Sequence, residues 1–355
     1  MSPLEHRVER DPAAVAAFRS EWEERCAADH QSLYASYEWC ASLWEAHFDG
    51  RGVDFHVFRD RSGLRAIVPI TRSRIEKFHV PLVMRGLLTN SYGRNHNDLI
   101  LFGDRTESYR AFLERLGSEP WDLLLLGSIA NPATLQMARD WERAGSYRVV
   151  PERYVDSPYL TLTGTWSEYL AAQSGNFRSD LKRKQKRAAA AGFRIRSLTS
   201  PTDVGEALDA MYSIETRSWK EGSGTSITTQ SHARRFYDVF LPKAAERGWL
   251  LCYLLELGGT PAAFDMGILH GGKYYMLKTS YDQEWKDVSP GFLLRAHVIE
   301  QLYAMGAREH DFLGDPEPWK LRWTSEIRSH WNLYLYNTRR LVPNLYSAAL
   351  KRFRS

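Results

Sequence analysis

The chain has 355 residues, of which 43% are hydrophobic and 25% charged, a composition typical of a soluble globular protein with about two domains. Its net charge of +4, from 47 basic and 43 acidic residues, does not favour a nucleic-acid-binding protein. The three cysteines form no C-x-x-C pair, so we expect neither a disulfide framework nor a metal site. The charged N-terminus and short apolar runs predict no signal peptide and no membrane-spanning helix, hence a cytoplasmic location.

The first 160 residues are predicted to form an α/β domain. Asp11 followed by Pro12 is typical of a helix start, and Ser36 is suited to cap a second helix. Helix and strand patterns then alternate, which favours a mixed sheet flanked by helices. The clearest helix patterns cover residues 12–26, 106–116 and 132–144, and the strand patterns cover residues 53–59, 64–72, 98–102 and 121–127.

A second domain is predicted from residue 161 to 355, after a break near residues 151–165. Its order of elements resembles that of the first domain, which suggests a structural duplication, although no sequence repeat is visible. Gly258-Gly259 is a dipeptide typical of a tight hairpin turn. The predicted helices cover residues 166–191, 204–219, 231–247, 290–305 and 317–325, and the strands cover residues 250–257, 262–270, 273–280, 308–313 and 330–337.

The triplet Ser289-Pro290-Gly291 precedes the helix predicted over residues 290–305. Ser289 is suited to the N-cap and Pro290 to the first turn, while Gly291 keeps side-chain bulk away from the exposed amides. Free amides and the positive end of the helix dipole make a helix start an anion site, for which a pyrophosphate is a natural occupant. Taken alone, the triplet is also explained as a good helix start.

Polar residues gather beyond this helix. Gly306 is suited to end it, a strand at residues 309–312 follows at once, and residues 314–320 read Gly-Asp-Pro-Glu-Pro-Trp-Lys. In a β-α-β arrangement, ligands bind beyond the C-terminal ends of the strands. The sequence therefore predicts a ligand site at the end of this strand.

Together these residues resemble the sequence motif of a known family. The positions that match this motif are Ser280-Tyr281-Asp282, Ser289-Pro290-Gly291, Gly306, Asp311-Phe312, Gly314 and Trp319-Lys320. The family is the BioF2-like or CelD-like acetyltransferase domain, a GNAT branch related to the FemAB-like peptidyltransferases. The resemblance is strongest over residues 166–337 and implies two tandem GNAT-like units, each a mixed β-sheet flanked by helices: a degenerate unit at 1–160 and a catalytic unit at 161–355. The family has Tyr where this chain has Trp319, so any role of that hydroxyl does not carry over.

The resemblance implies an enzyme that transfers an acyl group from acyl-CoA, or from a carrier thioester, to an amine. The acceptor would be a sugar, an amino acid or a precursor of the cell envelope or of a polysaccharide. The amides around residues 288–292 would hold the pyrophosphate of CoA, which agrees with the helix-start argument. His297 and Glu300, on the same helix, are secondary acid–base candidates. The expected donor-binding residues are Val288, Ser289, Pro290, Gly291, Phe292 and Arg295.

Attack of an amine on a thioester needs a deprotonated amine, aligned reactants and a hydrogen-bond donor for the oxyanion. Asp311 and Glu317 can orient or deprotonate an amine, or they have surface or structural roles, whereas strand alternation points His310 to the other face. Lys320 either binds an acidic acceptor or pairs with Glu317 across one helical turn. The expected catalytic residues are Asp311, Glu317 and Lys320, and the expected substrate-binding residues are Trp219, Tyr281, Trp319 and Arg178.

Basic residues are concentrated in the predicted helix at residues 176–187. Such a helix can contact the phosphates of tRNA, an acyl-carrier protein, an anionic lipid headgroup at a membrane surface or the 3′-phosphate of CoA, or it is only a solvated face. Trp219 precedes a Gly-Ser-Gly-Thr run at residues 222–225, which predicts a loop beside the acceptor site.

Three functions remain open from the sequence. The first is an acyl-CoA-dependent N-acyltransferase. The second is a Fem-like transferase that uses charged tRNA, which is disfavoured because no long helical hairpin insertion is visible. The third is a non-catalytic GNAT-fold binding module in polysaccharide biosynthesis, which the Trp319 departure keeps open. The acceptor, the acyl chain length and the oligomeric state are not determined by the sequence.

Overall fold

The structure is a computed structural model that describes residues 4–77, 80–89, 96–145, 147–218, 231–340 and 343. It divides into two compact units, one containing residues up to 156 and from 328 onward, the other containing residues 157–327. The division differs from the expected boundary at residue 160, because the last strand of the chain returns to the sheet of the first unit.

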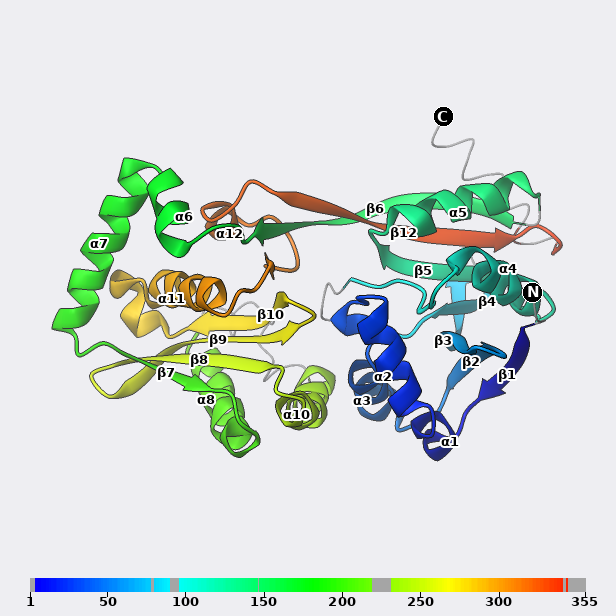
Figure 1. Cartoon of the computed structure of the whole chain (residues 1–355), viewed down its shortest axis with the longest axis horizontal. Coiled ribbons are helices and arrows are strands. Elements are labelled where there is room, and N and C mark those ends of the chain that lie inside the picture. Colours follow the sequence, from blue (N-terminus) through cyan, green and yellow to red (C-terminus); the bar gives the residue numbers. More distant parts are fainter. Residues whose placement is uncertain are drawn as a thin grey trace. The chain divides into compact units, whose positions relative to one another are not determined.

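The first unit has a mixed sheet in the order β1-β2-β3-β4-β5-β12, in which β4 and β5 run parallel (Figure 1). The strands are β1 (Glu5–Glu9), β2 (Val53–Asp60), β3 (Gly63–Lys77), β4 (Val80–Leu87), β5 (Leu123–Ile129) and β12 (Ile327–Asn337). The helices are α1 (Pro12–Ala16), α2 (Arg19–Ala28), η1 (Leu33–Ala35), α3 (Tyr37–Phe48), α4 (Arg105–Gly117) and α5 (Pro132–Arg143).

The second unit has a mixed sheet in the order β6-β11-β10-β9-β8-β7, in which β10 and β11 run parallel and to which β6 contributes only its last residues, from Ser157 onward. The strands are β6 (Tyr147–Thr161), β7 (Arg194–Leu198), β8 (Leu250–Leu257), β9 (Thr260–His270), β10 (Lys273–Tyr281) and β11 (Glu309–Asp311). The helices are α6 (Trp166–Ala172), α7 (Gly175–Ala190), η2 (Pro201–Asp203), α8 (Val204–Thr216), α10 (Ser231–Glu246), η3 (Gln283–Val288), α11 (Pro290–Ala304) and α12 (Pro318–Leu321).

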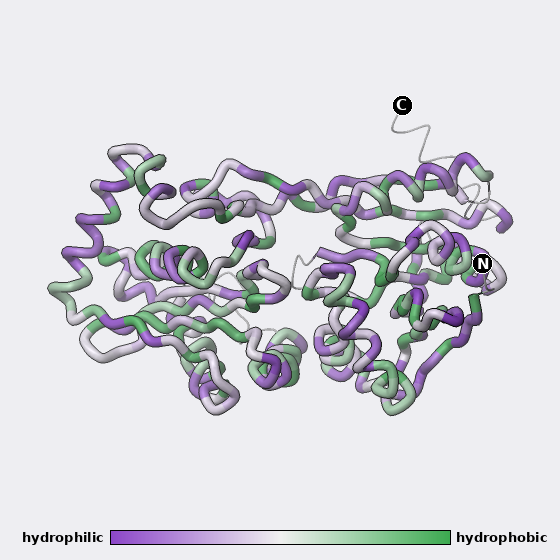
Figure 2. The backbone as a smooth tube through the Cα atoms, in the orientation of Figure 1, coloured by the Kyte–Doolittle hydropathy of each residue, from purple (hydrophilic) through white to green (hydrophobic). Residues whose placement is uncertain are grey.

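Helices cover both faces of the second unit's sheet. Figure 1 shows α6, α7 and α11 on one side of it and α8 and α10 on the other. Leu294, Val298 and Leu302 of α11 are buried in the core, while Met305, directly after the helix, is exposed. Each fully buried Leu side chain contributes about 1.5–3 kcal/mol to stability. Figure 2 shows that α7, in contrast, is mainly hydrophilic.

The two units share one topology. In each, an antiparallel pair (β3-β4 or β9-β10) is followed by a crossover helix (α4 or α11) and a parallel strand (β5 or β11). An antiparallel strand then pairs with the parallel one, β12 with β5 and β6 with β11. The expected fold class, two tandem units with mixed sheets flanked by helices, is confirmed.

Several expected elements differ from those observed. The helix expected over residues 12–26 is interrupted between α1 and α2, and residues 98–102 contain one isolated bridge, at Leu101, rather than a strand. The expected break near residue 151 is part of β6, whose residues 151–154 are all exposed and therefore show no alternating pattern. The helix expected over residues 317–325 is shortened to α12. No described helix has the length and hydropathy needed to cross a bilayer.

Candidate functional site

The parallel strands of the second unit separate after a short region of pairing. Lys273–Tyr275 of β10 pair with Glu309–Asp311 of β11, where β11 ends. β10 continues to Tyr281, and over this stretch its pairing partner among the described residues is β9. Met276 and Leu277 form a β-bulge opposite Gly267. Bulges and unpaired edges leave backbone groups outside the ladder, so this opening offers backbone donors and acceptors to a ligand.

The start of α11 is not capped in the usual way. Ser289 occupies the expected N-cap position, but its backbone is left-handed (φ 60°) and its side chain makes no capping bond. Its Oγ instead accepts a hydrogen bond from Lys184 Nζ at 3.0 Å. The corresponding helix of the first unit, α4, is capped by Asp104, whose carboxylate accepts from the Thr106 amide. The two crossover helices therefore present different charge to an anion.

Most amides around the start of α11 already have acceptors. The Ser289 N–H donates to the Lys286 carbonyl at 3.1 Å. The N–H groups of Phe292 and Leu293 share the Ser289 carbonyl at 3.1 and 3.3 Å. The Gly291 N–H has no acceptor among the described residues. Of the backbone amides expected to bind an anion over residues 288–292, the Gly291 N–H is therefore the one left to do so, together with nearby side chains.

Those side chains come from α7 and from the residues after α12. Lys184 Nζ lies 5.1 Å from the Phe292 ring centre, and the Arg322 guanidinium lies 4.4 Å from it. Arg187 Nη1 donates to the Asp287 carbonyl at 3.2 Å, just before the start of α11. The sequence grouped Lys184 and Arg187 only as part of a basic helix and did not single out Arg322. The structure places all three beside the helix start.

Asp180 joins two of these cations, Lys184 and Arg322, to Arg183. Its carboxylate lies near Arg183, Lys184 and Arg322. Burial would raise the pKa of Asp180, but hydrogen bonds from Arg322 and Arg183 and the charge of Lys184 lower it to about 2. Asp180 is therefore ionised at neutral pH and holds the basic side chains of α7 and Arg322 in one cluster.

The predicted residues Val288, Pro290 and Tyr281 pack around the same helix start. Pro290 is buried, and Val288 and Tyr281 are partly buried against the core of the unit. A Cβ atom added to Gly291 would lie 3.5 Å from Tyr281 Cδ1, an ordinary van der Waals contact. A methyl group therefore fits at Gly291, which makes that position suitable for substitution.

Arg295 lies away from the helix start. Its side chain is 2% exposed and forms an ion pair with Asp265 of β9. Its Nη1 is 3.1 Å from His310 Nε2, and the Tyr274 hydroxyl donates to Asp265. Burial, and then the charge of Arg295, lower the pKa of His310 well below its usual value, so the imidazole is neutral. The expected phosphate contact of Arg295 does not fit this buried position.

The residues expected at the end of β11 do converge on one loop. Asp311 is fully buried, and its Oδ1 accepts from the Leu313 N–H at 3.0 Å. Lys320 Nζ donates to the carbonyls of Leu313 (2.6 Å) and Asp315 (2.9 Å) and lies 3.4 Å from Glu317 Oε2. Burial lowers the pKa of Lys320. The pairing with Glu317 is present, but the closest contacts of Lys320 are carbonyl groups of the loop.

Glu317 and Trp319 are exposed residues of this loop. Trp319 is 37% exposed, and its Nε1 donates to Glu317 Oε2 at 3.1 Å. The Trp319 ring also lies 5.9 Å from the Arg295 guanidinium. The indole therefore connects the buried Arg295 group to the surface of the loop.

Two further ionisable residues lie on the α8 face of the sheet. Glu215 of α8 is fully buried, and its Oε2 is 3.3 Å from Lys278 Nζ, directly after the bulge. Tyr237 of α10 donates to the Leu277 carbonyl at 3.4 Å. The sequence analysis missed the pair of Glu215 and Lys278, although a Glu within the apolar stripe of a helix is a signal that could have indicated it. Asp311 is directed to this face, because its neighbour His310 packs toward α11.

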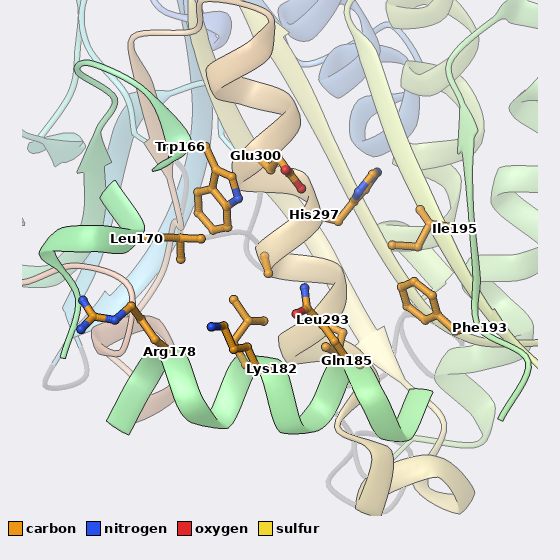
Figure 3. A pocket seen from close by; sticks show the side chains of 12 residues that line it. Trp166, Leu170, Arg178, Lys182, Gln185, Phe193, Ile195, Leu293, His297 and Glu300 are labelled. Carbon is orange, nitrogen blue, oxygen red and sulfur yellow. The ribbon is translucent and has the colours of Figure 1, made fainter. Parts of the chain in front are cut away.

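A cavity of about 330 Å³ lies between α6, α7, β7 and α11, on the side of α7 that faces away from Lys184 and Arg187 (Figure 3). The predicted residue Arg178 lines it, but Nη1 of Arg178 donates to the carbonyls of Ala171 and Gln173 and fastens the turn between α6 and α7. His297 and Glu300 also line this cavity, and burial lowers the pKa of His297. Arg178 is therefore not brought together with Tyr281 or Trp319.

Trp219 and the Gly-Ser-Gly-Thr run lie outside the described residues.

Residues 175–321 match the family model described as an acetyltransferase (GNAT) domain. A structure of FemX is similar in fold, with a TM-score of 0.63 and 12% identity over 93% of this chain and 98% of that one. The C-terminal domain of a putative lysylphosphatidylglycerol synthetase from Agrobacterium fabrum has a TM-score of 0.55 and 12% identity, covering 95% of each chain.

L-PGS from Bacillus licheniformis has a TM-score of 0.54 and 13% identity, covering 97% of each chain. No curated protein matches the sequence. Identities this low establish the shared fold alone, so substrates do not carry over from these structures.

Proposed function

From the match of residues 175–321 to the model of the acetyltransferase (GNAT) domain, we propose that the protein is an N-acyltransferase. It transfers an acyl group from acyl-CoA, or from a carrier thioester, to an amine of a sugar, an amino acid or an envelope or polysaccharide precursor. One observation carries the proposal: β10 and β11 separate after Tyr275 and Asp311, with a bulge at the point of separation, and the free end of β10 at Tyr281 lies against the start of α11.

The donor site is proposed along this opening. The phosphates of CoA would lie at the Gly291 amide, where the helix dipole and the cations Lys184, Arg187 and Arg322 supply positive charge. The pantetheine arm carries amide groups, and an extended amide chain binds a free strand edge through backbone hydrogen bonds. The segment of β10 that runs from the bulge to Tyr281 offers such an edge. The thioester would then lie at the bulge.

The acceptor is proposed to approach from the α8 face, toward which Asp311 is directed. The ammonium group of the acceptor loses one proton to a carboxylate, its nitrogen forms the new bond to the thioester carbon as the C–S bond breaks, and the leaving thiolate takes the second proton from the nitrogen. We assign the base role to Asp311, with Glu317 as a second carboxylate that positions the amine. Lys320, expected from the sequence to be catalytic, is proposed instead as a positioning residue, because its ammonium group holds the loop of Asp311 and Glu317 through the Leu313 and Asp315 carbonyls.

The donor site is tested with a matched pair of variants. Gly291→Ala adds a methyl group that fits, whereas Gly291→Glu adds a carboxylate where the phosphates would bind. Calorimetry with acetyl-CoA and a longer acyl-CoA is expected to show binding to the wild type and to Gly291→Ala, and at least tenfold weaker binding to Gly291→Glu. Equal affinity of all three proteins would remove the donor site from this position.

The base assignment is tested with Asp311→Asn. An Asn side chain still offers Oδ1 to the Leu313 N–H but cannot take a proton from an ammonium group. Release of the CoA thiol in the presence of amine acceptors is expected to fall by a factor of about 10²–10⁴, with unchanged acyl-CoA affinity. Full activity of this variant would exclude Asp311 as the base.

A Fem-like use of charged tRNA remains the second candidate, because α7 also carries exposed cations such as Arg183 and Lys186. Phosphate contacts make affinity fall steeply with salt. Aminoacyl-tRNA that binds with a steep salt dependence, and a chain that fails to bind acyl-CoA, would favour this donor. Acyl-CoA binding without transfer to any amine would instead favour a non-catalytic binding module.

A further inference from the structure

The cavity between α6, α7, β7 and α11 lies on the opposite side of α7 from the start of α11. Lys184 and Arg187 contact residues 287–289, whereas Lys182 and Gln185 line the cavity (Figure 3). Residues two positions apart on a helix point about 200° apart, so Lys182 and Lys184 serve different sides of α7. A ligand in the cavity is therefore separate from a ligand at the helix start.

Two opposite charges line this cavity without pairing. In the part of the chain that the structure describes, neither the Lys182 side chain nor the Glu300 side chain forms a hydrogen bond or an ion pair with another residue. The two side chains also do not pair with each other. α7 crosses α11 near the first turn of α11, where Lys184 contacts Ser289, whereas Glu300 lies near the other end of α11. Glu300 lies about 10 Å further along α11 than Leu293, at a rise of 1.5 Å per residue. Figure 3 shows Glu300 and Lys182 on opposite sides of the cavity.

The wall between these charges is mostly apolar. It consists of Leu170, Leu181, Ile195, Leu293 and Ala296, with Trp166 and the exposed ring of Phe193 at the rim. His297 adds one ring that can donate or accept a hydrogen bond. Ligand sites in proteins typically combine such apolar walls with a few polar groups that fix the orientation of the ligand. An apolar chain with a charged group at each end complements this arrangement.

We propose that this cavity binds a small zwitterion whose carboxylate and ammonium groups are joined by an apolar chain. The carboxylate lies at Lys182, beside the Arg178 guanidinium, and the ammonium lies at Glu300. The chain packs between Leu170 and Leu293. This site does not depend on the proposed acyl transfer, because none of its residues lies at the opening between β10 and β11.

Three probes of equal chain length test the proposal: 8-aminooctanoate, octanoate and octylamine. Calorimetry or ligand-observed NMR with the full chain is expected to show that 8-aminooctanoate binds several-fold more tightly than the two singly charged probes. Octanoate that binds as tightly as 8-aminooctanoate would overturn the role of Glu300. Failure of all three probes to bind would overturn the ligand class.

Variants separate the two ends of the site. Lys182→Met and Glu300→Gln are each expected to weaken 8-aminooctanoate about threefold to fivefold, as for partly exposed ion pairs. Glu300→Gln leaves octanoate affinity unchanged, and Lys182→Met leaves octylamine affinity unchanged. Lys186→Met is the matched control, because Lys186 is an exposed cation of α7 that does not line the cavity.

The charge-exchanged double variant, Lys182→Glu with Glu300→Lys, is expected to recover binding of 8-aminooctanoate, which then lies in the reverse direction. All these positions are polar, and the Lys and Glu that are changed are exposed, so folding is expected to be retained. A loss of affinity in Lys186→Met equal to that in Lys182→Met would contradict the proposal, because it would indicate a general charge effect of α7.

Discussion

Arg295 of α11 and Asp265 of β9 form an ion pair in which both side chains are almost fully buried. The pair fastens the crossover helix to the sheet beside the place where β10 and β11 separate. His310 and Tyr274 complete the group by contacting Arg295 and Asp265, respectively. The position of the helix start relative to the strands therefore depends on a buried charge pair.

Removal of one partner is expected to be costly. Arg295→Met leaves the Asp265 carboxylate buried without its cation, and the free energy of unfolding is expected to fall by about 3–5 kcal/mol. The double variant Arg295→Met with Asp265→Leu is expected to recover most of this loss, because both charges are gone. Urea denaturation measures both. A loss below about 1 kcal/mol in the single variant would show that the pair does not stabilise the helix.

Lys320 is expected to act mainly through the loop carbonyls. Lys320→Met removes the donor of the Leu313 and Asp315 carbonyls, and the free energy of unfolding is expected to fall by about 1–3 kcal/mol. Hydrogen exchange over residues 311–317 should become faster. Glu317→Gln is the control: it removes only an exposed partner and is expected to cost less than about 1 kcal/mol. Equal effects of the two changes would point to the ion pair instead.

Because of the charge cluster around Asp180 of α7, the free energy of unfolding is expected to depend on pH in the acidic range. The folded-state pKa of Asp180 lies below its ordinary value, so its contribution to stability is fully present above that value and is lost as pH falls toward about 2. The difference in unfolding free energy between wild type and Asp180→Asn is therefore expected to be constant near neutral pH and to shrink below about pH 4. Denaturation curves at several pH values test this. A difference that stays constant down to pH 3 would contradict it.

Gly267, opposite the bulge, is expected to tolerate no side chain. A Cβ atom there would lie 2.3 Å from Tyr274 Cζ, so Gly267→Ala must displace the ring that donates to Asp265. The expected loss is about 1–3 kcal/mol, as for other overpacked cores. Gly205→Ala in α8 is the matched control, since nothing lies within 4 Å of its added Cβ, and it is expected to be neutral or stabilising. Thermal unfolding compares the two, and equal melting temperatures would argue against the close contact.

The local signals in the sequence predicted much of the fold. Asp11 and Ser36 cap helices as expected, the hairpin at Gly258 is present, and Gly306 adopts the left-handed conformation that ends α11. These features depend on a few neighbouring residues, so a single sequence contains them. β1 and the full length of β6 were missed, because their pairing partners are distant in the chain and the exposed residues of β6 hide the alternation. β4, which pairs with the neighbouring strand β3, was missed as well.

The candidate site was predicted in part for the same reason. The residues of the loop after β11 are close in sequence, and the structure brings Asp311, Glu317 and Lys320 together there. The burial of Arg295 was not predictable, because it is determined by Asp265, which lies on another strand. The pair of Glu215 and Lys278 likewise joins two segments that only the tertiary fold brings together.

The carboxylate of Asp104 makes the two copies of the crossover unequal toward anions. An anionic cofactor is repelled at the start of α4, whereas at α11 it meets an unengaged amide and three cations. Duplication of the fold therefore does not double the number of donor sites. For the proposed donor, the stoichiometry expected in a titration is therefore one molecule of CoA per chain.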